Sequence, residues 1–221
     1  MPPPPPTSGP EHCYRHPNVE TGVHCTRCGR PICPECMIPA SVGFQCPDDV
    51  RETLEEQRKL WGAPLYPYLF YARSAAYFRA ANAMWAALQE DARHVPGTLR
   101  ALVNRRVAWW NACEYCQDAH AAKGSRLGIS TEKIEALNDY AKSPLFSDAE
   151  KVALEYADAI TDTHRDVDDE LFARLQRHYD ENTIAELTMI IAWQNASSRF
   201  NHAFRIPSQG FWKRLVTKTV G

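Results

Sequence analysis

The chain has 221 residues, of which 44% are hydrophobic, and its formal net charge is −2. A chain of this length can bury one sizeable core and a small additional module. The near-neutral charge excludes a global field that would recruit nucleic acid or an acidic membrane surface. The beginning of the chain has no apolar segment of a signal peptide, and no run of 18 apolar residues occurs in the sequence. We therefore expect a cytoplasmic protein with no membrane insertion.

The eight cysteines fall into two groups, six between positions 13 and 46 and two at positions 113 and 116. In a cytoplasmic chain, cysteines are typically metal ligands or redox thiols rather than structural disulfides. The split between the two groups predicts two domains. A proline-rich, polar segment, residues 1–11, precedes the first group, and we expect it to be a disordered tail.

Residues 12–50 form a cysteine-rich module in which metal-binding residue types recur in pairs, two residues apart. The pairs are Cys13 and His16, Cys25 and Cys28, Cys33 and Cys36, and Cys46 and Asp49. Such pairs place two donors on one tetrahedral zinc ion, and four pairs suit two ions. A segment this short has too little core to fold alone, so zinc would supply its folding energy. Aspartate is a harder, less typical ligand of structural zinc, and Asp48 or His24 is an alternative to Asp49.

The rest of the chain has the hydrophobic periodicity and the caps of helices. Residues 51–64 read as a linker helix, and residues 65–221 as one helical domain. The first two expected helices span about residues 68–89 and 98–111, and a third carries Cys116 and His120 and ends near residues 124–128. Four more are expected over about residues 130–140, 147–162, 168–178 and 182–204. Ser147 and Glu150 have the spacing of a capping box. No alternating strand pattern of useful length occurs, so the predicted fold class is all-α.

One stretch in this domain carries redox chemistry: Cys113, Cys116 and His120 have the pattern Cys-x-x-Cys-x-x-x-His. On a helix, residues four apart share a face, so His120 can lie beside Cys116. Cys113 lies one turn earlier, near enough for a disulfide. A thiolate is the reactive form of cysteine, and a helix N-terminus or a nearby histidine favours it. We therefore predict that these three residues form the catalytic site.

Between about residues 66 and 211 the chain resembles single-repeat members of the carboxymuconolactone decarboxylase and alkylhydroperoxidase D (AhpD) superfamily. The matching stretches are residues 106–113, 116–120, 147–154, 187–188 and 199–201. The resemblance implies an antioxidant enzyme with peroxiredoxin-type peroxidase or disulfide oxidoreductase activity, with no cofactor in this domain. It implies a hydroperoxide or disulfide substrate, a dithiol reductant such as a lipoyl group, and a homo-oligomer, a trimer or hexamer. Peroxidase-type members carry a relay glutamate twelve residues before the first cysteine, where this chain has Ala101.

The cysteine-rich module resembles a B-box or a similar cross-braced zinc finger, and also the segment that precedes some bacterial rhomboid proteases. A cross-brace would place one Zn²⁺ on Cys13, His16, Cys33 and Cys36. It would place the second on Cys25, Cys28, Cys46 and Asp49. The module has no basic stripe with interleaved aromatics, so we expect no nucleic-acid partner. B-box-like modules commonly serve protein contacts, which implies a structural or protein-interaction role.

Two alternative functions stay open at this point. The chain could be a non-enzymatic zinc-binding protein that senses redox state or binds a partner protein, since Ala101 replaces the relay acid. It could also be a decarboxylase-type enzyme that works by acid–base chemistry, although that reaction has no use for two thiols. Turnover of a hydroperoxide with a dithiol would separate the enzyme from the sensor.

Overall fold

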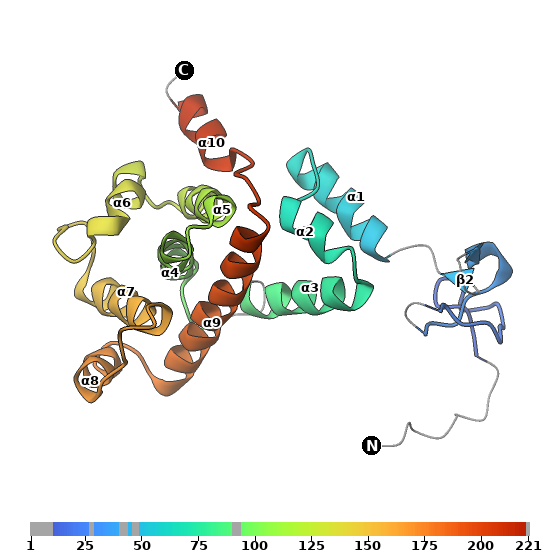
Figure 1. Cartoon of the computed structure of the whole chain (residues 1–221), viewed down its shortest axis with the longest axis horizontal. Coiled ribbons are helices and arrows are strands. Elements are labelled where there is room, and N and C mark those ends of the chain that lie inside the picture. Colours follow the sequence, from blue (N-terminus) through green and yellow to red (C-terminus); the bar gives the residue numbers. More distant parts are fainter. Residues whose placement is uncertain (1–10, 27–28, 40–43, 46–48, 90–93, 220–221) are drawn as a thin grey trace. The chain divides into compact units, whose positions relative to one another are not determined.

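The computed structural model describes residues 11–26, 29–39, 44–45, 49–89 and 94–219. The chain divides into two compact units, residues 1–82 and 83–221. Most of the described residues are helical, which confirms the all-α fold class (Figure 1). Within the described residues, no helix is both long enough and apolar enough to span a bilayer.

The first unit begins with the cysteine-rich module, which contains the 3₁₀-helix η1 (Pro34–Cys36) and two short strands. The strands β1 (Ile38–Pro39) and β2 (Phe44–Gln45) pair antiparallel, with Ile38 opposite Gln45. The core of the module is a cluster of five buried residues, namely Cys13, Cys25, Ile32, Cys33 and Cys36. So small an apolar core cannot hold the segment folded without a further source of stability.

Three helices follow in the first unit: α1 (Asp49–Trp61), α2 (Tyr66–Tyr71) and α3 (Ala75–Gln89), of which α3 continues into the second unit. Gly62, with a φ of 80°, ends α1 in the left-handed region that favours glycine. The expected continuous helix over residues 68–89 is wrong, because the helical run stops at Ala72 and restarts after Ser74. The Ser74 hydroxyl oxygen accepts the Tyr77 amide at 3.4 Å and so caps the second piece.

Helix α4 (Gly97–Trp110) is the central helix of the second unit. It packs against α5 (Glu114–Arg126), α7 (Asp148–Thr161) and α9 (Glu181–Ala203) (Figure 1). The shorter elements are α6 (Thr131–Glu135), η2 (Ala136–Asp139), α8 (Asp169–Gln176) and α10 (Phe211–Thr219). Leu102, Val103, Leu154, Leu187 and Ile191 are almost fully buried between these helices. Their apolar side chains fix how α4, α7 and α9 pack, and α5, which carries the predicted site, packs against α4.

The predicted caps of the second unit are present. Ser147 and Glu150 form the reciprocal capping box of α7, and Asp168 accepts the Leu171 amide at 2.8 Å at the start of α8. The helix α10 has no counterpart among the expected elements. Its first amides, those of Phe211 and Trp212, donate to the Asp118 carboxylate of α5 at 2.9 and 2.7 Å. Its cap therefore comes from another helix.

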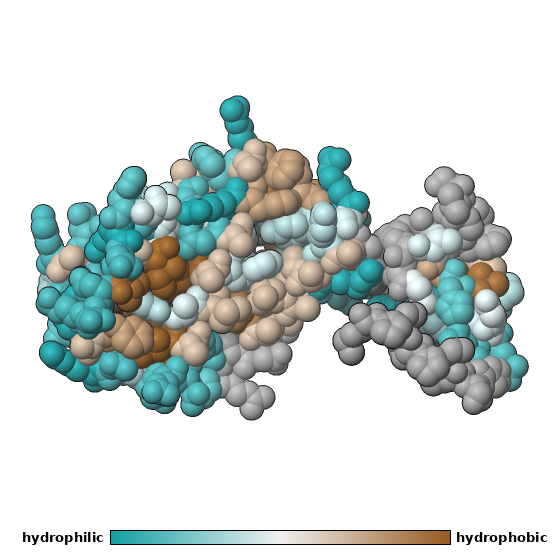
Figure 2. All heavy atoms as spheres, turned by 60° about the horizontal axis from the view of Figure 1, so that its bottom comes forward, coloured by the Kyte–Doolittle hydropathy of each residue, from teal (hydrophilic) through white to brown (hydrophobic). Residues whose placement is uncertain are grey.

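Large apolar side chains are also exposed on the chain. The face drawn in Figure 2 has brown apolar areas bordered by polar side chains. In the first unit, Leu60 is 78% exposed and Tyr77 is 72% exposed, and in the second unit Phe204 is 51% exposed. Contact with another protein molecule would remove such side chains from water.

Candidate functional site

The predicted thiol pair lies at the N-terminus of α5. Cys113 is the N-cap residue of this helix, and its Sγ accepts the Cys116 amide at 3.2 Å. The two Cα atoms are 5.3 Å apart, and the two sulfurs are joined in a disulfide. The exposed fractions of the two residues are only 1% and 3%. A helix N-terminus favours the thiolate form of a cysteine, so this position suits a redox pair.

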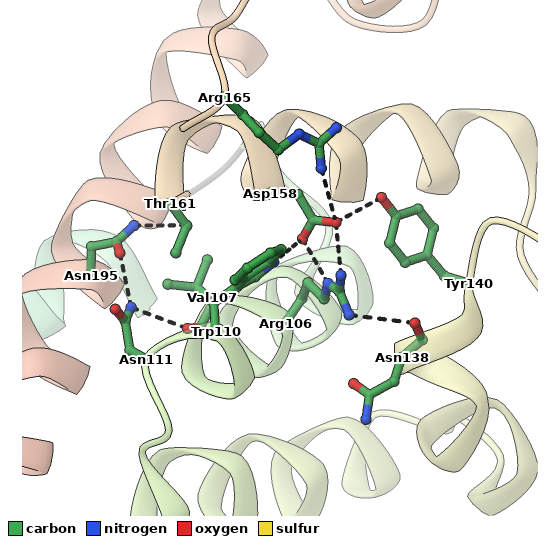
Figure 3. A network of polar contacts seen from close by, with 10 residues as sticks. All are labelled: Arg106, Val107, Trp110, Asn111, Asn138, Tyr140, Asp158, Thr161, Arg165 and Asn195. Carbon is green, nitrogen blue, oxygen red and sulfur yellow. Dashed lines mark hydrogen bonds and ion pairs between the residues drawn. The ribbon is translucent and has the colours of Figure 1, made fainter. Parts of the chain in front are cut away.

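The turn that leads into Cys113 holds a strained residue. Ala112 has a φ of 48°, a left-handed conformation that costs a residue other than glycine roughly 1 kcal/mol or more. Nδ1 of His202, on α9, lies 3.1 Å from the Ala112 carbonyl oxygen and donates to it. On the other side of the turn, the side-chain Nδ2 of Asn111 donates to Asn195 Oδ1 of α9 at 2.8 Å (Figure 3). Helix α9 therefore holds this turn and the thiol pair in place.

His120 is buried near the thiol pair on the same helix, with 5% of its surface exposed. Its Nε2 donates to Gln194 Oε1 at 2.9 Å, and its ring stacks on Trp85 with the ring centres 6.1 Å apart. Burial, with a smaller contribution from the Lys123 charge, lowers the pKa of His120 to about 3. The imidazole is therefore neutral at physiological pH. Because Nε2 carries the hydrogen, Nδ1 holds the lone pair, and no partner among the described residues binds it.

This burial predicts an acid-sensitive fold. In the unfolded chain, His120 takes up a proton near its ordinary pKa of 6.5, whereas in the folded chain it stays neutral down to about 3. Its contribution to stability is complete above pH 6.5 and is lost as the pH falls through this window. Between pH 7 and pH 4.5 we expect it to remove about 2–3 kcal/mol from the free energy of unfolding, measured by urea titration.

The control for this prediction is a pair of histidine variants. His120→Asn should reduce the fall in unfolding free energy between pH 7 and pH 4.5, whereas His178→Asn, at an exposed position just after α8, should leave it unchanged. An equal pH dependence in wild type and His120→Asn would show that His120 is not the group that is kept neutral by burial.

Sequence reasoning missed one contact of the thiol pair. The Asn201 amide nitrogen lies 3.2 Å from Sγ of Cys116 and donates to it. Asn201 is 1% exposed and comes from α9, as do Gln194 and Ser198, which lie on the same buried face of that helix. The segment 199–201 belongs to the matched pattern, but nothing in the sequence shows that its asparagine reaches a sulfur 85 residues away.

No carboxylate takes the place of the relay acid among the described contacts of the thiols and His120. Ala101 is 2% exposed, and its Cβ lies 3.6 Å from the position that a Cβ on Gly124 would take, where α4 and α5 pack closely. Glu114 is exposed, and the Asp118 carboxylate caps α10. The polar groups around the site are therefore a neutral imidazole and side-chain amides.

Arg106, seven residues before Cys113 on α4, is bound to a carboxylate and not to the thiol site. Its Nε and Nη2 donate to the two oxygens of the buried Asp158 at 2.6 and 2.9 Å (Figure 3). Trp110 Nε1 and the Tyr140 hydroxyl donate to the same carboxylate at 2.6 and 3.0 Å. This buried ion pair is fully hydrogen-bonded and joins α4 to α7. Arg105 remains as the neighbouring cation, and its charge contributes to lowering the pKa of His120.

In the cysteine-rich module, the structure brings together the first predicted ligand set. The ligand atoms of Cys13, His16, Cys33 and Cys36 all lie within 4.8 Å of one another. His16 Nδ1 is 3.9, 3.2 and 3.5 Å from the sulfurs of Cys13, Cys33 and Cys36. Tetrahedral zinc with ordinary Zn–N and Zn–S bonds would separate these atoms by about 3.6 Å. The four side chains therefore fit a zinc ion.

The second predicted ligand set lies mostly outside the described residues. Cys28 and Cys46 are not described, nor is the side chain of Asp49. Cys25 is described, and it is 2% exposed in the core of the module. His24, an alternative ligand, forms an ion pair with Glu11. The second zinc site therefore stays a prediction.

Comparisons with known proteins agree with this architecture. The family model "Carboxymuconolactone decarboxylase family" matches residues 75–159. The uncharacterized protein YnjA of Escherichia coli (strain K12) is 38% identical over 153 residues, which cover 69% of this chain and 84% of YnjA. The uncharacterized protein YdfG of Bacillus subtilis (strain 168) is 34% identical over 107 residues, covering 48% of this chain and 73% of YdfG.

Solved structures share the fold at lower identity. An uncharacterized peroxidase-related protein from Ralstonia eutropha JMP134, described as an alkylhydroperoxidase AhpD core, superposes with a TM-score of 0.68 at 21% identity, over 75% of this chain and 88% of that chain. The debrominase Bmp8 superposes with a TM-score of 0.66 at 20% identity, with the same coverage. At these identities the likeness shows the fold. Together with the family model and the match to YnjA, it shows that the chain belongs to the carboxymuconolactone decarboxylase family.

Proposed function

We propose that the chain is a thiol-dependent oxidoreductase of the AhpD type that reduces hydroperoxides through Cys113 and Cys116, with His120 as proton carrier. The observation that carries the proposal is the pair of buried cysteines at the N-terminus of α5, on the same helix as a neutral imidazole whose Nδ1 lone pair has no partner among the described residues. Fold neighbours described as peroxidase-related support an antioxidant role. The proposed activity is peroxidase activity of the peroxiredoxin type.

The proposed cycle has two steps before reduction. One thiolate attacks the hydroperoxide, so that an S–O bond forms, the O–O bond breaks, and the alkoxide takes a proton and leaves as an alcohol. The second thiol then attacks the sulfenic sulfur, and the oxygen leaves as water while the Cys113–Cys116 disulfide forms. In total, one hydroperoxide and two thiols give an alcohol, water and a disulfide. Because the low pKa of His120 does not allow a stable imidazolium, its Nδ1 relays the thiol proton to the leaving oxygen as the O–O bond breaks.

The burial of the two cysteines favours one of the two substrate classes that the sequence leaves open. The residues Cys113 and Cys116 are almost inaccessible, so a small hydroperoxide suits the site better than the disulfide of a folded protein. The reductant must also reach the sulfurs. A lipoyl group, which is a dithiol at the end of a long flexible arm, meets this need. It would reduce the disulfide by thiol–disulfide exchange and close into its own cyclic disulfide.

The experiment that tests this function uses the full chain with cumene hydroperoxide as substrate and dihydrolipoamide as reductant. We expect peroxide to be consumed catalytically, and the Cys113–Cys116 disulfide to accumulate when the reductant is left out. A protein that forms this disulfide reversibly but consumes no peroxide beyond the uncatalysed rate would be the redox-sensing interaction protein instead. The acid–base decarboxylase alternative receives no support, because the site offers a neutral base and, among the described residues, no carboxylate hydrogen-bonded to the thiols or to His120.

Asn201 adds a prediction about the thiolate. Its amide donor at 3.2 Å from Sγ of Cys116 should stabilise the charged form of that sulfur. In a Cys113→Ser background, we expect Asn201→Ala to raise the pKa of the Cys116 thiol by about one unit, since a hydrogen bond to a charged group contributes about 1.5–3 kcal/mol. The pH dependence of iodoacetamide alkylation measures this pKa.

Two further variants control this measurement. Asn201→Asp has the same shape but brings a negative charge, so it should raise the pKa more than Asn201→Ala does. Ser197→Ala, a buried change on the same helix, should leave the pKa unchanged. If Asn201→Ala leaves the pKa of the Cys116 thiol unchanged in the Cys113→Ser background, the Asn201 side-chain amide does not stabilise the thiolate.

We also propose that the N-terminal module is a zinc site, with one Zn²⁺ held by Cys13, His16, Cys33 and Cys36. The ligand atoms of these residues lie as close together as those of a tetrahedral zinc site, which supports this proposal. A second Zn²⁺ on Cys25, Cys28, Cys46 and Asp49 is proposed from the cysteine spacing alone. With four protein ligands and no open position, the first site is structural, and the folded module would then offer a surface to a partner protein. A cytoplasmic location would keep these thiolates reduced.

Finally, we propose that the chain forms a homo-oligomer, a trimer or hexamer, as family members do. The exposed large apolar side chains, such as Leu60 and Tyr77, support an assembly that covers them. Sedimentation velocity of the full chain measures its mass. A monomer at micromolar concentration would contradict this proposal without affecting the redox chemistry.

A further inference from the structure

A cavity of about 610 Å³ lies in the second unit, away from the helices that carry the thiol site. Its walls come from the facing sides of α7 and α8, from the chain after η2, and from the segment that joins α7 to α8. Residues of α5 and α9, which carry the cysteines, His120, Gln194 and Asn201, do not line it. Its volume falls in the range of sites that bind small molecules.

Positive charge dominates the lining. Four cationic side chains, Lys151, Arg165, Arg174 and Arg177, face two carboxylates, Asp148 and Glu155. Arg174 Nη2 lies 2.6 Å from Glu155 Oε1, so this pair is internally neutralised. Lys151 and Arg177 have no ion-pair partner in the described parts of the chain. With all four cations, Arg165 included, counted against the two carboxylates, the cavity carries an excess of two positive charges in a chain whose net charge is −2.

The third cation, Arg165, is also in surplus. The only carboxylate that it approaches in the described residues is Asp158, at 3.8 Å (Figure 3). That carboxylate is already neutralised by the close, two-pronged contact of Arg106 and accepts hydrogen bonds from Trp110 and Tyr140. Asp158 is therefore neutralised without Arg165, whose positive charge is left uncompensated. The Arg165 side chain is 40% exposed.

Two further features suit a bound molecule rather than a solvated surface. Nε of Arg174 is buried and has no hydrogen-bond partner among the described residues. Val152, which is 5% exposed, and Tyr140, which is 7% exposed, give the cavity an apolar side beside its charges. An apolar wall with a few converging cations is the usual composition of a site for an organic anion.

From these observations we infer that the cavity between α7 and α8 binds a small organic anion that carries at least two negative charges, held by Lys151, Arg165 and Arg177. A phosphate ester and a di- or tricarboxylate share this chemistry. The guanidinium groups can bind either of them through paired hydrogen bonds.

Isothermal titration calorimetry of the full chain tests this inference, with pyrophosphate and citrate as probes and acetate as the singly charged control. We expect wild type to bind at least one probe and not acetate, and the stronger probe identifies the class of ligand. The double variant Lys151→Gln with Arg177→Gln should weaken this binding at least tenfold. Lys213→Gln with Arg205→Gln removes two exposed charges outside the cavity and should change it by less than twofold.

A single substitution is expected to have the opposite effect, stronger probe binding. Glu155→Gln removes the carboxylate that occupies Arg174, so it should tighten probe binding several-fold. This result would support the site even if the double variant were unfolded. Three outcomes would overturn the inference. They are no heat of binding with either probe at millimolar concentration, an equal loss of probe affinity in the two double variants, or weaker probe binding in Glu155→Gln than in wild type.

Discussion

Replacing either Cys113 or Cys116 with serine is expected to lower dithiol-dependent hydroperoxide reduction by at least about a thousandfold, because neither serine can form the disulfide that completes the cycle. The substitution at Cys113 should leave the fold intact. This residue is the N-cap of α5, and a serine hydroxyl accepts the Cys116 amide as well as the sulfur does. The measurement is the rate of cumene hydroperoxide loss with dihydrolipoamide.

A third cysteine variant provides the matched control. Cys33→Ser makes the same chemical change in the N-terminal module, and we expect it to keep peroxide turnover while it loses zinc. The two single variants of the pair also identify the attacking thiol, since only the variant that retains it can form a sulfenic acid, which dimedone traps for mass spectrometry. Full turnover in Cys113→Ser or Cys116→Ser, or its loss in Cys33→Ser, would contradict the assignment of the site.

The sequence predicts much of the fold because its helix signals are local. Ser147 and Glu150, three residues apart, satisfy each other's backbone at the start of α7, and Asp168 caps α8 without help from another element. Helix α10 was missed because its cap, Asp118, lies more than 90 residues earlier in the chain. The break between α2 and α3 was missed because the apolar pattern continues through it, while Ser74 starts a new helix.

The candidate site divides in the same way. The spacing of Cys113, Cys116 and His120 along one helix is visible in the sequence, and so is the pairing of Cys13 with His16. The contacts from α9 are not visible in the sequence, because Gln194 contacts His120 and Asn201 contacts Cys116 only once the helices have packed. The protonation of His120 also depends on burial. Spacing alone permits an imidazolium that stabilises a thiolate, whereas burial makes the imidazole a neutral base.

Loss of zinc is expected to unfold the N-terminal module, because its buried core is little more than four cysteines and Ile32. Structural zinc contributes about 10–16 kcal/mol to the folding of such small segments, more than the apolar contacts of so small a core can supply. We expect the purified chain to hold at least one zinc ion per molecule, measured by elemental analysis. A strong chelator, or Cys33→Ser, should make residues 11–39 sensitive to protease.

The stoichiometry of zinc decides between one site and two, because the two ligand sets share no residue. One ion that is lost in Cys33→Ser assigns the metal to Cys13, His16, Cys33 and Cys36. Two ions, of which Cys28→Ser removes one, would add the set that contains Cys25, Cys46 and Asp49. Cys113→Ser is the matched control and should keep all of the zinc, since its sulfur belongs to the other unit. A chain that is purified without chelators and holds no zinc, yet resists protease over residues 11–39, would contradict the zinc site. The module would then have to fold on a core of five small buried side chains, which is less than an independent fold requires.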